Sequence, residues 1–304
     1  MRVITLGTSA GVATSTRNVS STALVHNGKI FLFDVGEGTL GQMRKANLRL
    51  SRIHVIMISH MHGDHINGLP SLLSAIDLDA QGKRRQLVTL IGPVGISLYV
   101  DTLQLLGLIN TDILLVRRPL MPTKEVVYND DAYTITAAPL QHRCSCYGFA
   151  FREALRPGEF YPREADALGV PAGPAFAALR RGESVISTHG MVVHPEQVIG
   201  EPRPGKSFVY CTDTAVCDAG KDLAAGADVL VHDGTYGDDM AEHAATRGHS
   251  TARQAAQLAK GAGVGRLILT HISPSVKGDG SLLRSAQEAF RNTIIANDLY
   301  AEEW

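Results

Sequence analysis

A short stretch around residue 60 carries side chains of the types that bind metal ions. His60, His62, Asp64 and His65 supply three imidazoles and one carboxylate within six positions, and these are ligands that zinc prefers. Alternation directs His60 and His62 to one side, and a turn at Gly63 brings the other two to a neighbouring point. The pattern indicates two adjacent metal ions rather than a solvated histidine-rich turn, because it directly follows an apolar strand. The full run is Ser59-His60-Met61-His62-Gly63-Asp64-His65.

Three more residues of ligand type follow predicted strands later in the chain. The strands span residues 133–138, 207–211 and 267–270, and the residues that follow them are His142, Asp213 and His271. Because ligands bind outside the carboxyl ends of strands in α/β sheets, we expect these side chains to join the first motif. A lone histidine is more often structural than a ligand. The prediction therefore depends on the set of seven residues as a whole.

The elements that must position these residues alternate between strands and helices. Residues 54–59 form an apolar run of strand length, which suits a strand buried on both faces. Residues 21–26 and 30–34 predict a hairpin around Asn27-Gly28. Residues 250–261 are rich in alanine and predict a helix. Strands and helices in two comparable halves predict an α/β sandwich with sheets inside and helices outside.

The composition excludes several classes of protein. The chain has 304 residues, of which 44% are hydrophobic and 19% charged, so it supports a full core and is not disordered. A formal net charge of −1 excludes the globally basic surface of an architectural nucleic-acid binder, although a local basic face remains compatible with it.

The same composition bears on location. No stretch reaches the roughly 20 apolar residues of a membrane-spanning helix, and MRVITLGTSAG is not an apolar leader. The four cysteines form neither a CxxC pair nor a disulfide framework. We expect a cytoplasmic protein with no membrane partner, in which Cys144 and Cys146 are small buried residues.

A series of short motifs surrounds these ligands along nearly the whole chain. They are Leu6-Gly-Thr-Ser, Arg17-Asn18, Phe33-Asp-Val-Gly-Glu-Gly-Thr39, Gly68-Leu-Pro70, Gly92-Pro93, Ala138-Pro-Leu-Gln-His142, Tyr147-Gly148, Asp213-Thr214, Gly248-His-Ser-Thr251 and Leu269-Thr-His271. HxHxDH with later His, Asp and His resembles the metallo-β-lactamase superfamily, and the whole series resembles ribonuclease Z, the tRNA 3′-processing endonucleases. The resemblance implies a metallo-β-lactamase-like αββα sandwich with a protruding arm, one domain over residues 1–304, and the short homodimeric form.

The resemblance also implies two zinc ions per chain, with other divalent ions as alternatives. It further implies a particular hydrolytic reaction. Paired metal ions activate water and stabilise the oxygens of an in-line displacement at phosphorus. The implied reaction removes 3′ trailers from precursor tRNA and leaves a 3′ hydroxyl on the tRNA. The implied ligands are His60, His62 and His142 for one ion, Asp64, His65 and His271 for the other, and Asp213 as the bridge.

Three residues are implied to act in catalysis. Asp64 would orient the attacking water, and His249 resembles the family's proton donor to the leaving 3′ oxygen. The family usually has His-Glu-Ala-Thr-Phe where this chain has His232-Asp233-Gly234-Thr235-Tyr236. Asp233 keeps the carboxylate that would orient His249 but is one methylene shorter, which leaves that contact open.

Residues 153–204 stand apart from the pattern of strands and helices. The segment holds seven prolines and predicts a long irregular loop or arm. Its sequence resembles the family's flexible tRNA-gripping arm, which implies substrate contacts at Gly173, Pro174, Arg180 and Arg181. Acidic residues such as Glu159 are interleaved, so composition alone predicts an ordinary solvated loop.

A second departure from the family keeps other functions open. After the last metal-binding histidine the family usually has an Arg-Tyr pair, whereas this chain has Ser273-Pro274-Ser275-Val276. Lys277 is a candidate substitute, but a point charge does not reproduce the bidentate fork of arginine. One alternative is a hydrolase of this fold acting on another phosphodiester or small substrate. The other is a non-catalytic metal-binding or RNA-binding module, which the complete ligand set argues against.

Overall fold

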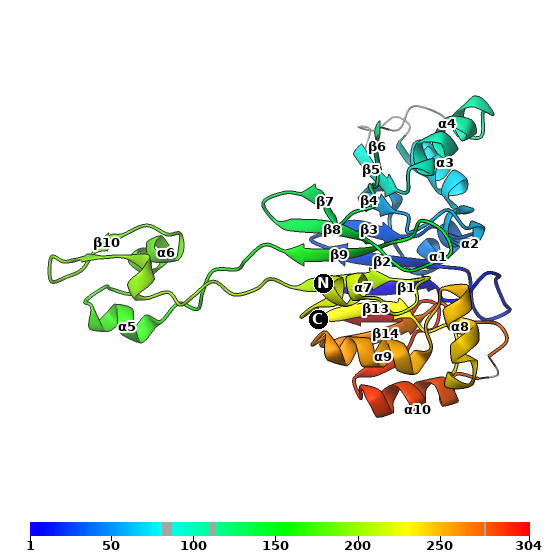
Figure 1. Cartoon of the computed structure of the whole chain (residues 1–304). Coiled ribbons are helices and arrows are strands. Elements are labelled where there is room, and N and C mark those ends of the chain that lie inside the picture. The colour runs from blue at the N-terminus through cyan, green and yellow to red at the C-terminus, as the bar shows by residue number, and fades with distance from the viewer. Residues whose placement is uncertain (81–86, 110–113, 277) are drawn as a thin grey trace. The chain divides into compact units, whose positions relative to one another are not determined.

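The computed structural model describes residues 1–80, 87–109, 114–276 and 278–304. The chain divides into two compact units (Figure 1). The first comprises Met1–Asp130, Thr134–Phe151 and Ser207–Trp304, and the second comprises Asp131–Tyr133 and Arg152–Lys206. None of the described helices combines the length and the apolar character needed to cross a membrane.

The first unit is built on two seven-stranded sheets. Both change from antiparallel pairing at one side to parallel pairing at the other. In order across the first sheet, the strands are β16 (Ala301–Glu303), β1 (Arg2–Gly7), β2 (Ser21–His26), β3 (Lys29–Phe33), β4 (Ile53–Met57), β5 (Leu87–Gly92) and β6 (Leu114–Pro119). Across the second they are β15 (Thr293–Ile295), β14 (Arg266–Thr270), β13 (Val229–Asp233), β12 (Ser207–Cys211), β9 (Tyr147–Glu153), β8 (Tyr133–Pro139) and β7 (Glu125–Asn129).

Aromatic rings fill the space between the two sheets. Phe33 on β3 contacts Phe208 and Tyr210 of β12, with ring centroids 5.1 and 5.2 Å apart. Phe31, two residues earlier on the same face, contacts Phe151 of β9 at 5.0 Å. Side chains alternate between the two faces of a strand, so these aromatic residues join the sheets while their neighbours face the helices.

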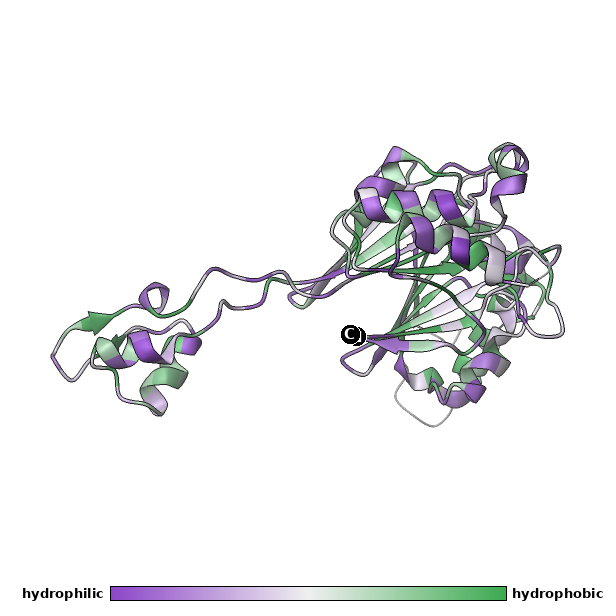
Figure 2. Cartoon of the chain, turned by 90° about the horizontal axis from the view of Figure 1, so that it is seen from below, coloured by the Kyte–Doolittle hydropathy of each residue, from purple (hydrophilic) through white to green (hydrophobic). Residues whose placement is uncertain are grey.

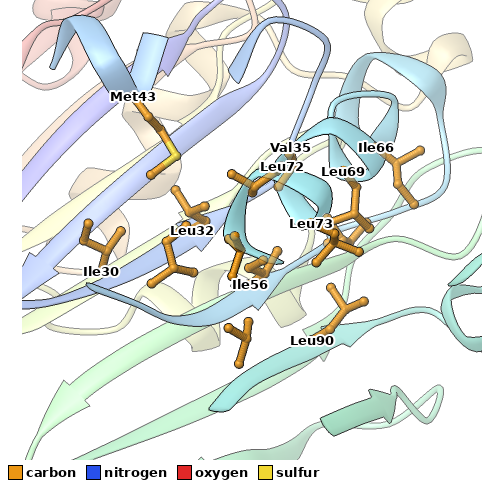
Figure 3. Packing of buried hydrophobic residues seen from close by; sticks show 14 of the residues in the cluster. Ile30, Leu32, Val35, Met43, Ile56, Ile66, Leu69, Leu72, Leu73 and Leu90 are labelled. Atoms are coloured by element: carbon orange, nitrogen blue, oxygen red, sulfur yellow. The ribbon is translucent and has the colours of Figure 1, made fainter. Parts of the chain in front are cut away.

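Helices cover the outer face of each sheet. Figure 3 shows one such layer, in which Leu32 of β3 and Ile56 of β4 pack against Leu69, Leu72 and Leu73. Figure 2 shows hydrophilic stretches on these outer helices and hydrophobic stretches along the strands. The helices of this unit are α1 (Thr39–Lys45), α2 (Gly63–Ile66), α3 (Leu69–Ala80), α4 (Gly95–Leu105), α7 (Asp218–Ala224), α8 (Ala241–Arg247), α9 (Ala252–Gly261) and α10 (Gly280–Ala289).

This arrangement confirms the predicted sandwich. The hairpin turns at Asn27 and Gly28, both with positive φ, and β4 is buried on both faces as its apolar run predicts. The predicted helix over 250–261 begins two residues later, at Ala252. Thr251 is its N-cap and accepts a hydrogen bond from the backbone N–H of Gln254, whose side chain completes a capping box.

The second unit has its own small core. Residues 153–204 were expected to be irregular, and that expectation is wrong. The segment contains α5 (Pro162–Ala167), α6 (Pro174–Arg180) and a hairpin of β10 (Val185–Ile186) and β11 (Val192–Val193). The prolines mislead because two of them occupy helix N-termini, where proline is favoured. The buried residues of this core are Ala165, Val170, Leu179, Val193 and Val198.

Candidate metal centre

The histidine-rich turn leaves β4 and leads directly into helix α2. Ser59 and His60 are buried, whereas His62 and Asp64 are partly exposed. The Nε2 atom of His60 lies 2.8 Å from the Nδ1 atom of His62. Gly36 packs against the turn from the loop after β3, where a Cβ would lie 2.4 Å from the carbonyl oxygen of Asp64. Only glycine therefore allows these two loops to approach so closely.

Side chains from three other strand ends reach this turn. Asp213 follows β12, His142 follows β8 and His271 follows β14. The Nε2 atoms of His65 and His271 each lie 3.1 Å from Asp213 Oδ1. The Nε2 atom of His60 lies 3.7 Å from Asp213 Oδ2. Asp213 is therefore adjacent to both halves of the histidine-rich turn.

The ligand-type atoms form overlapping groups, within each of which they lie within 4.8 Å of one another. The structure thus brings together all seven residues that the sequence nominates, with Asp213 between two sets of three. Their roles as ligands stay a prediction. Among the described residues, the groups include His60, His62, His142 and Cys144, then Asp64, His65 and His271, and finally His60, His65 and Asp213.

Four of the five histidines predicted to bind metal have an oxygen atom within hydrogen-bond distance of Nδ1, the ring nitrogen that points away from the site. In each, the Nδ1–H donates a hydrogen bond outward, so that Nε2 is presented to the group of ligand atoms. Gly248 can approach His142 closely enough to accept such a bond, because a Cβ at its positive φ would lie 2.9 Å from His142 Cα. The pairs are His60 with the Ser59 hydroxyl (3.0 Å), His65 with Asp34 (2.7 Å), His142 with the Gly248 carbonyl (2.9 Å) and His271 with the Thr235 hydroxyl (3.1 Å).

Asp34 is the centre of this outer set. Its buried carboxylate accepts hydrogen bonds from His65, from the hydroxyl of Tyr210 at 2.8 Å, and from both the amide and the hydroxyl of Ser59 at 2.7 and 2.8 Å. Sequence reasoning assigned no role to Asp34 or to Thr235. For Asp34 a usable signal existed, because a carboxylate directly after an apolar strand needs partners.

The backbone is unusual where these strands end. Asp34, Asp213 and His271 adopt positive φ values of 58°, 51° and 59°. Non-glycine residues in this region cost on the order of 1–3 kcal/mol each, and such residues cluster at functional sites. The sharp turns direct three side chains to the site instead of along their strands.

Several buried polar atoms lack a hydrogen-bond partner among the described residues. They include His65 Nε2, His142 Nε2 and Asp213 Oδ1, all of which face the same group of ligand atoms. Leaving such atoms without partners is costly unless a bound species satisfies them. Imidazole nitrogens and a carboxylate with 4.8 Å or less between them fit a divalent metal ion such as zinc.

Electrostatics agree with that fit. Burial, followed by the nearby His65, lowers the pKa of His60 to about 2, so its imidazole is neutral, the form that binds metal. Burial alone would also lower the pKa of His65, but the carboxylates of Asp213 and Asp34 raise it well above the ordinary value. The site therefore combines a neutral imidazole at His60 with a place at His65 that favours positive charge.

Asp233 and His249 form the contact that the sequence left open. The Nδ1–H of His249 donates to Asp233 Oδ2 at 2.7 Å, so the shorter carboxylate does reach the ring. Asp233 is buried and also accepts from the Thr214 amide at 3.1 Å and the Thr235 hydroxyl at 2.7 Å. The ring of His249 lies 5.3 Å from that of His271. The Thr235 hydroxyl also lies 3.1 Å from Nδ1 of His271, so it links the Asp233–His249 pair to a predicted metal ligand.

The predicted substrate contacts lie in the second unit. Gly173 is the N-cap of α6 and Pro174 its first residue. The guanidinium of Arg180 lies over the ring of Phe160, 4.7 Å from its centroid. Arg181 donates hydrogen bonds of 2.8 and 3.0 Å to Glu183. The two arginines therefore differ, because Arg181 already has a carboxylate partner.

The loop after His271 carries hydroxyl groups where the family has arginine. The Oγ atoms of Ser273 and Ser275 lie 2.8 Å apart. Lys277, the candidate substitute, lies outside the described residues.

The prediction for the cysteines is half wrong. Cys146 is buried, whereas Cys144 is exposed, with its Sγ atom 3.7 Å from Nε2 of His62. The alternation that predicted burial applies to a strand. Cys144 precedes β9 in a turn, where alternation does not hold.

Two family models match parts of the chain. The one described as Anti-Pycsar protein Apyc1 matches residues 1–94, and the one described as Beta-lactamase superfamily domain matches residues 175–272. Curated relatives match over the whole length. Ribonuclease Z of Prochlorococcus marinus (strain MIT 9313) is 40% identical over 318 residues, covering 100% of this chain and 98% of the relative. Ribonuclease Z of Synechococcus sp. (strain CC9311) is 41% identical, covering 98% and 97%.

A solved structure agrees with these relatives. Human tRNase Z, short form, superimposes with a TM-score of 0.72 at 26% identity, covering 100% of this chain and 99% of that chain. The similarity therefore includes both sheets and the residues of the second unit.

Proposed function

Because the chain belongs to the ribonuclease Z family of metal-dependent endonucleases with the metallo-β-lactamase fold, we propose that it removes 3′ trailers from precursor tRNA. Cleavage leaves a 3′ hydroxyl on the tRNA and a 5′ phosphate on the trailer. The observation that carries this proposal is the gathering of seven ligand-type side chains at strand ends beside the Asp233–His249 pair.

The metal assignment follows the two sets of ligand atoms. His60, His62 and His142 would hold one divalent ion, mainly zinc, and Asp64, His65 and His271 would hold the other, with Asp213 available to both. Short separations support this, such as 3.1 Å from Asp213 Oδ1 to both His65 and His271. When bound, such a pair of ions activates water and neutralises charge on the phosphoryl oxygens.

In this proposal, Asp64 orients the attacking water and His249 donates a proton to the leaving oxygen. Asp64 Oδ2 is held by the Gly11 amide at 2.9 Å and is well placed to orient the attacking water. Burial lowers the pKa of His249, but the Asp233 carboxylate more than offsets this and raises it overall. With Nδ1–H donated to Asp233, the proton on Nε2 goes to the 3′ oxygen as its bond to phosphorus breaks.

The second unit supplies contacts to the tRNA in this proposal, as an arm over residues 153–204 inserted in a single domain of residues 1–304. It carries seven acidic and seven basic residues between Arg152 and Lys206, so net charge does not explain RNA binding. Local contacts must do so instead. Arg180, whose guanidinium rests on Phe160, is better placed than Arg181 to meet a phosphate, and Gly173 and Pro174 are exposed at the opposite end of α6.

We also propose that the protein is a cytoplasmic homodimer. The described cysteines are free, as expected in a reducing compartment. Helix α4 exposes Leu98 and Leu105, at 70% and 86%, one heptad apart on the same face, and Val94 precedes them at 68% exposure. Such apolar exposure is typical of a subunit interface. L98E with L105E should convert a dimer to a monomer in light scattering, and an unchanged mass would exclude this surface.

Cleavage of a precursor tRNA with a defined 3′ trailer tests the function. The protein should produce one cut at the trailer junction with a ligatable 3′ hydroxyl, lose activity with a chelator and regain it with zinc. Hydrolysis of a small phosphodiester such as bis-p-nitrophenyl phosphate, with precursor tRNA left intact, would instead support the alternative hydrolase.

A further inference from the structure

Cys144 contacts the predicted metal ligand His62, and its Sγ atom belongs to one of the groups of ligand-type atoms. The ring of His62 has Nδ1 at 2.8 Å from Nε2 of His60, so this nitrogen faces another predicted ligand. The opposite nitrogen, Nε2, lies 3.7 Å from the Sγ atom of Cys144, which is within hydrogen-bond distance for sulfur.

His62 differs in this respect from the other four predicted histidine ligands. Each of those four donates its outer N–H to an oxygen atom at 2.7 to 3.1 Å. For His62, the only outer contact among the described residues is the sulfur of Cys144. Sulfur is a weak acceptor, so His62 is the least firmly held ring of the five.

Cys144 is also the accessible thiol of the chain. Cys146 and Cys211 are buried and Cys217 is half-buried, whereas Cys144 is exposed. A reagent in solvent therefore reaches the atom that contacts His62 without first unfolding the core.

We propose that Cys144 is a positioning residue that holds His62 in its metal-binding orientation, and that covalent modification of its thiol weakens metal binding at the three-histidine side of the centre. The inference rests on the metal assignment of the proposed function. Partners at the second nitrogen of a ligating histidine are typically worth 10- to 100-fold in metal affinity. A group attached to Sγ moves the sulfur away from its position against His62 and so removes this contact.

Zinc affinity of the full-length protein, measured by competition with a chromophoric chelator, tests the positioning role. C144A should lower the affinity for one of the two zinc ions by about 10- to 100-fold. C144S should restore most of the affinity, because a hydroxyl also accepts a hydrogen bond, and C217A should match the wild type. Equal affinities in C144A and the wild type would overturn the proposal.

Cobalt substitution separates positioning from direct ligation. The wild type should show no sulfur-to-cobalt charge-transfer band, while C144A should alter the ligand-field bands of one ion. A charge-transfer band that disappears in C144A would make Cys144 a ligand and overturn the positioning role.

Methyl methanethiosulfonate tests the modification. The thiolate of Cys144 forms a disulfide with the methylthio sulfur, methanesulfinate leaves, and the thiol proton passes to solvent. Treatment should release about one ion of the two from the wild type and from C217A but not from C144S, and dithiothreitol should restore binding. Release from C144S as well would overturn the claim.

None of these measurements uses RNA. A protein that binds two ions with this dependence on Cys144 and leaves precursor tRNA intact would refute the proposed substrate and retain the inference. A wild-type protein that binds no metal would overturn both.

Discussion

The metal centre and the second unit differ in how deeply their predicted functional residues are buried and in how those residues are held. At the metal centre, predicted ligands such as His60, His65 and Asp213 are buried, and backing atoms such as the Asp34 carboxylate hold them. In the second unit, the predicted contacts are exposed, and their partners lie on the same small unit, as with Arg181 and Glu183. The first arrangement costs strain and desolvation, and the second costs little.

This difference indicates what each region can do. Side chains held from behind by oxygen atoms keep one geometry, which a metal centre needs for catalysis. Exposed arginines keep their freedom and their hydration, so each contributes modestly and mainly through phosphate contacts that depend on salt. Substitutions in the two regions should therefore differ in size and in which substrate they affect.

The largest effect is expected for D213N. Asparagine keeps the shape and tolerates the positive φ of Asp213, but removes the charge that lies against both predicted sets of ligands. Both ions should bind far more weakly, and turnover of precursor tRNA and of bis-p-nitrophenyl phosphate should fall by well over ~100-fold. Rates and metal content are measured together, with circular dichroism as the control for folding. A variant with normal metal content would exclude Asp213 as the bridge.

His249→Ala should lower kcat by about 10²–10⁴-fold while the metal content stays normal, if, as proposed, the side chain donates a proton and does not bind metal. His243→Ala is the matched control, since this histidine is exposed on α8. Single-turnover rates on precursor tRNA give the comparison. Metal loss in His249→Ala would make the residue a ligand and remove its role as an acid.

Asp34→Asn should weaken zinc binding by about 10- to 100-fold, since the amide cannot replace the charge that accepts from His65. Chelator competition measures this, and excess zinc should recover much of the activity. Activity that stays low at saturating zinc would show that Asp34 does more than hold a ligand.

R180A and R181A should have the smallest effects and should act on one substrate only. Each should raise the KM for precursor tRNA and reduce the slope of log affinity against log salt by about 1 for each phosphate that the variant no longer neutralises. The Arg180 variant should have the greater effect, because Arg181 is already paired with Glu183. Hydrolysis of bis-p-nitrophenyl phosphate should not change. Equal losses on both substrates would mean that these arginines support the fold.

Much of the metal centre could be predicted from sequence because its residues sit at strand ends. The run before His60 is apolar on both faces, and His142, Asp213 and His271 each follow a strand. Parallel strands that end at one edge bring such residues together whatever their separation in sequence. Asp34 also follows a strand directly, but it is not part of a sequence pattern typical of metal ligands.

Features that depend on three-dimensional contacts could not be predicted. The reach of Asp233 to His249 depends on how closely the turn packs, not on residue type alone. The small core of the second unit comes from scattered residues such as Val170 and Val198, without a clear period. The exposure of Cys144 required knowing where β9 begins.

Metal content per chain is the most direct test of the central claim that this buried edge of two sheets holds a pair of divalent ions. It should be measured on the wild type, His65→Ala and Arg180→Ala purified in parallel. The account predicts two ions in the wild type and in the Arg180 variant, and fewer in the His65 variant. Two ions in His65→Ala would contradict it.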